Sequence, residues 1–248
     1  MRSNISRYPR LAAAALAVAA LGACAAQPRG LAQTGARVGL ARVALQSGNA
    51  SGALRLADRA LAHHPGDPAA LLLRGEALSR LGQTAPARAA FAQVLSDRPD
   101  SVPALVGLGR LRLIDAPDRA ASLFRHALAE APGNTAALTD LGVALDLQGA
   151  HAAAQASYRL ALAADPTLVP ARVNLALSLA QSGQGPAAVA MMAPMAGSKA
   201  AGPKLREDYA AVLTMAGQAE KASAVLAGEM PPAEAAAALA AYAAGPGK

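Results

Sequence analysis

The 248-residue sequence contains no tryptophan, only four tyrosines and two phenylalanines, and a single cysteine. Isoleucine occurs only at Ile5 and Ile114, and other β-branched residues are few. Because β-branched and aromatic side chains are the ones that pack well on a pleated sheet, this scarcity excludes an all-β or parallel-sheet core. The lone cysteine excludes an intramolecular disulfide. Alanine, in contrast, supplies 71 residues, and the chain should be all-helical.

Charge is also scarce, because charged residues make up 16% of the chain and hydrophobic residues 54%. This balance argues against intrinsic disorder. Residues 173–198 carry no charge, but their Asn, Gln, Ser, Gly and Pro residues interrupt any membrane span of about 20 apolar residues. The net charge of +7 comes from scattered basic residues, without a cluster or interleaved aromatics, which argues against nucleic-acid binding.

The first 23 residues have the pattern of a secretory signal peptide. Arg2, Arg7 and Arg10 form a positively charged start, and the apolar run from residue 11 to residue 21 is too short for a stable membrane span. We therefore expect residues 1–23 to be removed from the mature protein.

Residues 21–24 (Leu-Gly-Ala-Cys) resemble a bacterial lipobox, in which lipid is attached to the cysteine thiol. The resemblance implies that Cys24 is lipidated and becomes the first residue, although a chance thiol in a discarded peptide is the alternative. Ala25, in place of Asp, implies sorting to the outer membrane, with the protein on its periplasmic face. Acyl chains are strong anchors, because each buried methylene contributes about 0.8 kcal/mol. Residues 24–33 have no helical stripe and are predicted to be a lipidated tether.

A 34-residue period organises the remainder of the chain. Glycines recur with spacings of 34, 67, 34 and 34, where the double interval indicates one repeat that has lost a residue and its glycine. Prolines that would end the second helix of each unit recur in step. These are Gly48, Gly82, Gly149, Gly183 and Gly217, and Pro65, Pro99, Pro132 and Pro166. This period is typical of tetratricopeptide repeats, which are helix-turn-helix units that stack into a solenoid.

Small and aromatic residues follow the same period, as expected where paired helices approach within about 8–10 Å. The predicted packing residues are Ala53, Gly75, Ala87, Phe91, Gly109, Ala120, Phe124, Gly142, Ala154, Tyr158, Ala176 and Ala188. The fold prediction is an all-α, right-handed tetratricopeptide superhelix over residues 34–230. Its units are 34–67, 68–101, 102–134, 135–168, 169–202 and 203–230, and residues 231–248 form a capping helix and tail.

No catalytic constellation is present in the sequence. His63 and His64 are adjacent near a helix end, where a structural role is favoured over metal binding. Gly107 and Gly109 lack the third glycine and preceding strand of a dinucleotide fingerprint. We therefore predict a protein that is not an enzyme, with no cofactor, metal or small-molecule substrate.

Function is expected in the groove, because the first helices of tetratricopeptide units line the concave face of the superhelix. The mixture of charged and apolar residues there suits an extended or helical peptide, and a solvated face is the alternative for each residue. The candidate groove residues are Arg42, Glu76, Arg80, Arg110, Thr139, Asp146, Val173, Leu177 and Glu207.

Repeats behind a lipobox resemble the TadD family of Flp pilus assembly lipoproteins, which belong to the tight-adherence secretion system. The specific likeness is in residues 172–180 (RVNLALSLA), in Ser182, Gly183 and Gly217, and in the Pro-Pro-x-Glu-Ala close of residues 228–235 with Tyr242. The resemblance implies a non-enzymatic outer-membrane factor that helps the pilus secretin and other assembly lipoproteins to localise or assemble. Two alternatives remain open: a pilotin of a type IV pilus secretin, and an envelope adaptor that regulates peptidoglycan enzymes.

Overall fold

The computed structural model describes residues 29–244, and the side chains of residues 34–244. The predicted signal peptide, Cys24 and most of the predicted tether lie outside these residues. Over residues 29–244 the chain forms thirteen α-helices and no strand, so the all-α prediction is confirmed. The helices are α1 (Arg29–Gln46), α2 (Ala50–Leu61), α3 (Pro68–Arg80), α4 (Thr84–Asp97), α5 (Val102–Arg110), α6 (Pro117–Glu130), α7 (Thr135–Asp146), α8 (His151–Ala164), α9 (Val169–Gln181), α10 (Gly185–Ala196), α11 (Pro203–Met215), α12 (Ala219–Leu226) and α13 (Pro232–Ala244).

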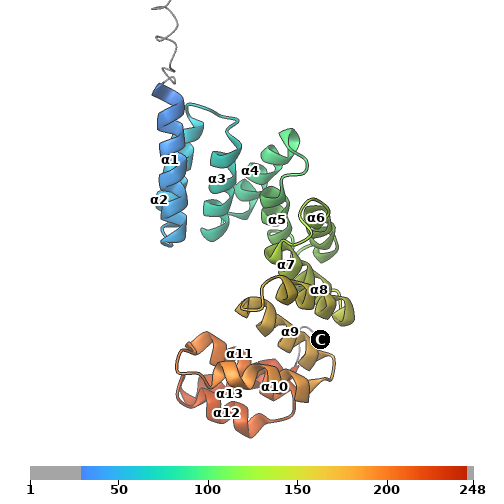
Figure 1. The fold of residues 1–248 in the computed structure, drawn as a ribbon. Coiled ribbons are helices and arrows are strands. Elements are labelled where there is room, and N and C mark those ends of the chain that lie inside the picture. Colours follow the sequence, from blue (N-terminus) through green and yellow to red (C-terminus); the bar gives the residue numbers. More distant parts are fainter. Residues whose placement is uncertain (1–28, 245–248) are drawn as a thin grey trace, which may run out of the picture.

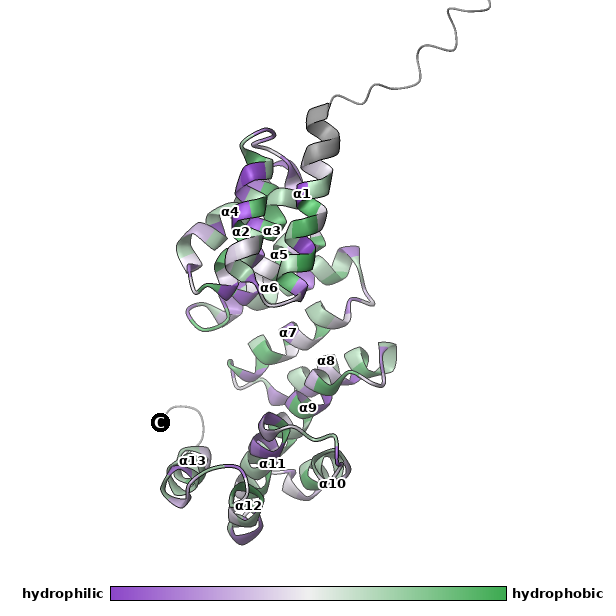
Figure 2. Ribbon diagram, turned by 90° about the vertical axis from the view of Figure 1, so that its left-hand side faces the viewer, coloured by the Kyte–Doolittle hydropathy of each residue, from purple (hydrophilic) through white to green (hydrophobic). Residues whose placement is uncertain are grey.

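Successive helices pair as helix-turn-helix units, from α1 with α2 to α11 with α12, and the units stack into an elongated, twisting array (Figure 1). The last helix, α13, packs against α11 and α12 and caps the end of the stack, as predicted. Figure 2 shows hydrophobic residues spread over every unit, as expected where each pair buries its apolar faces against its neighbours. None of the helices that the structure describes combines the length and hydropathy needed to cross a membrane.

The first helix begins earlier than the sequence pattern indicates. Residues 29–33, which were expected to belong to the tether, form the first turns of α1. They lack an apolar stripe, but leucine, alanine and glutamine are good helix formers. A helix that packing establishes further along the chain therefore extends back to Arg29, and the tether prediction was wrong for these five residues.

The turns within the units depend on glycine. Gly48, Gly82, Gly149, Gly183 and Gly217 all have positive φ angles, between 72° and 81°. This left-handed conformation is strained for other L-residues, so glycine recurs at this position. The third unit lacks the glycine: α5 ends early, at Arg110, and Arg88 from the preceding unit donates a 2.9 Å hydrogen bond to the Leu111 carbonyl in the irregular turn.

The small residues of the first helices lie against the aromatic rings of the second helices. A Cβ atom placed on Gly75 would lie 2.8 Å from Phe91 Cε1, one on Gly109 2.5 Å from Phe124 Cε1, and one on Gly142 2.3 Å from Tyr158 Cε1. Such distances leave no space for a side chain. All twelve residues predicted to pack the repeats are buried, and Phe124 and Tyr158 are among the most completely buried side chains of the described residues.

The array curves so that the first helices form its inner layer. Each first helix contacts the next one along the array, from α1 and α3 to α9 and α11. Within the described residues, no contact joins consecutive second helices from α2 to α12. The first helices therefore lie closer together than the second helices, and the face they line is the concave one.

Candidate binding groove

The nine candidate groove residues separate into three groups in the structure. Arg42, Glu76, Arg80 and Arg110 are exposed, and Asp146, Leu177 and Glu207 are partly buried. Thr139 and Val173 are buried, at 8% and 7% exposure, so their assignment to the groove surface was wrong. Both precede the small crossing residue of their helix by three positions, and residues three apart share a helix face. They therefore lie on its inward side.

The capping helix covers Glu207. The phenol of Tyr242 on α13 donates a 2.9 Å hydrogen bond to Glu207 Oε1 on α11. Burial, followed by this hydrogen bond, raises the pKa of Tyr242 to about 12. Arg206 also bonds to Glu229, which ties α11 to the segment that leads into α13. The groove is thus limited on the α11 side, and Glu207 stabilises the cap instead of facing open groove.

A first pocket lies between α3 and α5, with a volume of about 290 Å³. We call it the Phe91 pocket, after the aromatic ring at its base. Its walls are mainly apolar, and Glu76 and Arg110 are the charged side chains at its edge. The lining residues are Leu72, Glu76, Phe91, Val102, Pro103, Val106, Gly107, Arg110, Asn134 and Ala136. Gly107 keeps it open beside the ring, because a Cβ atom there would lie 2.5 Å from Phe91 Cζ.

A second pocket of about 410 Å³ lies between α7 and α9, and we call it the Tyr158 pocket. Val143, Leu147 and Leu177 give it apolar walls, with amide, imidazole and carboxylate groups around them. The remaining lining residues are Asp146, Gly149, His151, Tyr158, Asn174 and Gln181. Two candidate groove residues, Asp146 and Leu177, thus meet in one pocket.

The two pockets occupy equivalent positions of the repeat. Four lining residues of the Phe91 pocket have a counterpart 67 residues later, or two repeats, in the Tyr158 pocket. The pairs are Glu76 with Val143, Phe91 with Tyr158, Gly107 with Asn174, and Arg110 with Leu177. The groove therefore repeats its shape while changing its chemistry.

An ion pair lies between α5 and α7, at the junction between the two pockets. Arg110 Nε donates to Asp140 Oδ2 at 2.6 Å, which links α5 to α7. The arginine side chain is 53% exposed and the aspartate 16%. Burial raises the pKa of Asp140, although the nearby guanidinium acts in the opposite direction. A charged ridge thus separates the two apolar pockets along the groove.

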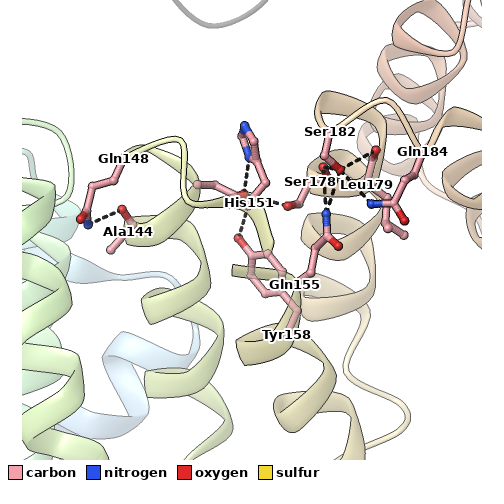
Figure 3. A network of polar contacts seen from close by, with 10 residues as sticks. Ala144, Gln148, His151, Gln155, Tyr158, Ser178, Leu179, Ser182 and Gln184 are labelled. Atoms are coloured by element: carbon pink, nitrogen blue, oxygen red, sulfur yellow. Dashed lines mark hydrogen bonds and ion pairs between the residues drawn. The ribbon is translucent and has the colours of Figure 1, made fainter. Parts of the chain in front are cut away.

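Asp146, which lines the Tyr158 pocket, is the centre of a polar network, and Figure 3 labels its partners Tyr158, Ser178 and His151. Its Oδ2 accepts a 2.9 Å hydrogen bond from the phenol of Tyr158, and its Oδ1 accepts one of 2.7 Å from Ser178. The Nδ1 atom of His151 lies 2.8 Å from Oδ1. Burial, followed by the Asp146 charge, raises the pKa of Tyr158.

This network joins three helices rather than activating a nucleophile. The hydroxyl of Ser178 is fully buried and donates to the carboxylate, not to the imidazole of His151. On the other side, Gln155 Nε2 donates to Ser182 Oγ at 2.9 Å, so α8 is also held to the end of α9. The group fixes α7, α8 and α9 around the pocket, and it lacks the serine–histidine bond of acyl-transfer enzymes.

A further cluster lies outside the groove. Asp100, His126 and Glu130 are exposed, and each offers a ligand atom within 4.8 Å of the others. His126 Nε2 and Asp100 Oδ1 lie 2.8 Å apart, which an ordinary surface hydrogen bond explains. Of the two remaining histidines, His63 is exposed on the turn after α2 and His64 is partly buried beside it.

Sequence reasoning missed several lining residues, among them His151, Asn174 and Gln181. Phe91 and Tyr158 were recognised only as packing residues, although they also form the pocket floors. Aligning the first helices on their small residues would have found part of the set, because Asn174 then falls opposite Gly107 and Asp140. His151 has no such signal, because it reaches the pocket from the start of a second helix.

Comparison with known proteins agrees with this geometry. Two tetratricopeptide repeat models match the sequence, over residues 44–111 and 115–168. A search of curated protein sequences finds no significant match.

Solved structures show the same fold. PilW, described as a widely conserved type IV pilus biogenesis factor, is 23% identical, with a TM-score of 0.71 over 79% of this chain and 93% of that one. PilF of Pseudomonas aeruginosa is 14% identical, with a TM-score of 0.70 over 86% and 99% of the two chains. A thermophilic tetratricopeptide repeat protein of Thermus thermophilus is 24% identical, with a TM-score of 0.65 over 73% and 98%.

Proposed function

Because this chain is a tetratricopeptide-repeat protein, we propose that it is a scaffold that binds protein partners through its concave groove. The observation that carries the proposal is the pair of apolar pockets at equivalent repeat positions on the inner layer. Concave apolar pockets with a few polar groups are the usual form of a binding site. The convergent polar groups of this groove are occupied in holding helices together, as in the Asp146 network.

We further propose that the scaffold is anchored by lipid on Cys24 to the periplasmic face of the outer membrane. The lipobox-like sequence before Cys24 and the small residue Ala25 after it support this location. Several acyl chains would hold the array stably at the bilayer, whereas a single chain gives only marginal binding. Between residue 24 and the start of α1 at Arg29 only four residues intervene, so the α1 end of the array would stay close to the membrane.

The process we propose is assembly of the Flp pilus of the tight-adherence system, with the pilus secretin and other assembly lipoproteins as partners. Support comes from the resemblance of residues 172–180 and 228–235 to the TadD family. The similarity of fold to PilW favours a second candidate, a pilotin-like factor for a type IV pilus secretin. Both candidates share an envelope-anchored array whose groove binds a secretion component.

Membrane fractionation tests the anchor. Cys24→Ser should move the protein from the membrane to the soluble fraction and abolish the acyl mass on its N-terminal peptide. The matched variant Ala25→Asp should keep the acyl mass but move the protein from outer- to inner-membrane fractions. Membrane retention of Cys24→Ser without acyl mass would refute the lipid anchor.

Affinity capture from detergent-solubilised envelopes tests the partner. We expect secretin and assembly lipoproteins to be recovered with the wild-type chain, and recovery to fall when Leu177→Asp introduces a charge into the Tyr158 pocket. Capture of peptidoglycan enzymes without secretin would reject the pilus proposal in favour of an envelope adaptor.

A further inference from the structure

The groove presents two apolar pockets with one cation between them. The Phe91 pocket lies at the α3–α5 junction and the Tyr158 pocket at the α7–α9 junction, and Arg110 on α5 stands between them. The acidic side chains that line these pockets are already engaged by neighbouring residues. Glu76 is bonded to Arg80 at 2.7 Å, and Asp146 is engaged on both oxygens.

Arg110 has unused hydrogen-bonding capacity. Its Nε atom donates to Asp140, but its two Nη atoms donate no hydrogen bond to any described residue. The side chain is also 53% exposed, whereas its partner Asp140 is 16% exposed. A guanidinium with free Nη groups binds carboxylates in a bidentate manner, and such charge-assisted bonds are the strong ones. The ridge between the pockets is therefore suited to an acidic side chain.

The distance between the pockets sets the spacing of the ligand. Packed helices lie about 8–10 Å apart, so two steps between first helices span about 16–20 Å. An extended chain advances about 3.3 Å per residue, so about five or six residues cover this distance. Successive side chains of an extended chain point to opposite sides. Two side chains that both enter pockets must therefore be an even number apart, and six satisfies both conditions.

We propose that the groove binds an extended acidic peptide segment in which two bulky apolar residues are six positions apart and an Asp or Glu stands two or four positions after the first. The apolar side chains enter the Phe91 and Tyr158 pockets, and the carboxylate binds the Nη groups of Arg110. This inference rests on the proposed scaffold function and gives the chemical class of its ligand.

The probe is a fluorescein-labelled synthetic 12-residue peptide with two leucines six positions apart and an aspartate two after the first, in a serine background. Its binding to the full chain in detergent micelles is measured by fluorescence polarisation. Replacing the peptide aspartate by asparagine should weaken binding about tenfold, the size expected for a hydrogen bond to a charged group. Moving the second leucine by one position should also weaken it, because that side chain would then point away from the groove.

Variants of the protein locate the contact. Arg110→Ala should weaken binding about tenfold, and the aspartate-to-asparagine change should then have no further effect, since both remove the same bond. Arg159→Ala, at an exposed arginine of α8 that lines neither pocket, is the matched control and should bind as wild type. Arg110→Lys keeps the positive charge but cannot bind a carboxylate in the bidentate geometry, so it should also weaken binding of the acidic peptide. This variant is the second test if Arg110→Ala does not fold.

Selection of random peptides on the full chain gives an independent readout. Enrichment of peptides with two apolar residues six positions apart and an acidic residue between them would support the proposal. Enrichment of basic peptides would overturn it. Apolar residues about 11–13 positions apart would also overturn it, because that spacing fits a helical ligand with a rise of 1.5 Å per residue. Equal effects of Arg110→Ala on acidic and neutral peptides would also overturn it. Capture of envelope partners despite these failures would leave the scaffold function intact, whereas failure of both capture and selection would contradict the scaffold function itself.

Discussion

The contact between Gly142 and Tyr158 allows a sharp test of how the repeats pack. A Cβ atom at Gly142 would lie 2.3 Å from Cε1, 2.6 Å from Cζ and 2.7 Å from Cδ1 of the tyrosine ring. Carbon atoms pack at about 3.5–4.0 Å, so α7 and α8 would have to separate by about 1 Å or the ring would have to move. The ring is confined, because Tyr158 is 1% exposed and its hydroxyl is bonded to Asp146.

Gly142→Ala therefore combines two opposing effects. Overpacking a core typically costs about 1–3 kcal/mol. Alanine in place of glycine within a helix gains about 1 kcal/mol. We expect the sum to lower the free energy of unfolding by about 1 kcal/mol, although the substitution is favourable for an isolated helix. Urea denaturation of the full chain, followed by circular dichroism, measures the change.

Gly39→Ala is the matched control, because Gly39 lies in a helix and is exposed, and a Cβ atom placed on it would have no neighbour within 4 Å. This variant should gain up to about 1 kcal/mol, so the two substitutions should differ by about 2 kcal/mol. Equal stabilisation by Gly142→Ala and Gly39→Ala would refute the close approach of α7 to the Tyr158 ring.

Three further predictions concern the repeat core. Ala154→Leu should lower the free energy of unfolding by about 1–3 kcal/mol, because Ala154 is fully buried at a helix crossing, and the exposed neighbour Ala153→Leu should change it little. Unaltered urea denaturation of Ala154→Leu would contradict the repeat phase. Gly149→Ala should cost about 1–2 kcal/mol, because φ is 73° there, whereas Gly133→Ala, at a loop glycine without positive φ, should not; thermal denaturation separates the two. Burial raises the pKa of Tyr158 above its ordinary value of about 10, so the folded state keeps a proton that the unfolded chain loses. The stability that Tyr158 contributes is therefore complete below about pH 10 and is lost as the pH rises above that value. Tyr158→Phe should remove this part of the fall in the free energy of unfolding, measured by denaturation at a series of pH values. An unchanged fall in the variant would contradict the raised pKa of Tyr158.

The packing of the array could be predicted from the sequence, because steric constraints allow few residue types at the helix crossings and turns. Only a small residue fits where a first helix crosses the ring of its partner, so Gly75, Gly109 and Gly142 recur with the period. The turn glycines recur for a comparable reason, since their backbone is left-handed. Where the period fails, in the third unit, the structure replaces the glycine turn with a bond from Arg88 to the chain after α5.

The groove residues could be predicted less well, because the exposure of a side chain depends on which other elements of the fold cover it. Thr139 and Val173 were assigned to the groove by their repeat phase, yet both are buried on the inward side of their helices. Glu207 lies at a position that would face the groove if the array continued, and α13 covers it instead. The sequence predicts that a capping helix exists, but no periodic pattern states on which face it docks.

The same contrast explains where binding specificity can reside in a repeat array. The residue after each small crossing residue changes from Glu76 to Arg110, Val143 and Leu177, although the backbone around it repeats. Packing constrains this position less than the crossing residue itself, because the side chain is exposed at Glu76 and Arg110 and only partly buried at Val143 and Leu177. Its chemistry can therefore differ between units, from charged to apolar, and each unit can contribute a different contact. The charged ridge at Arg110 and the apolar wall at Leu177 are two products of this freedom, and exchanging such residues should alter ligand choice more than it alters the fold.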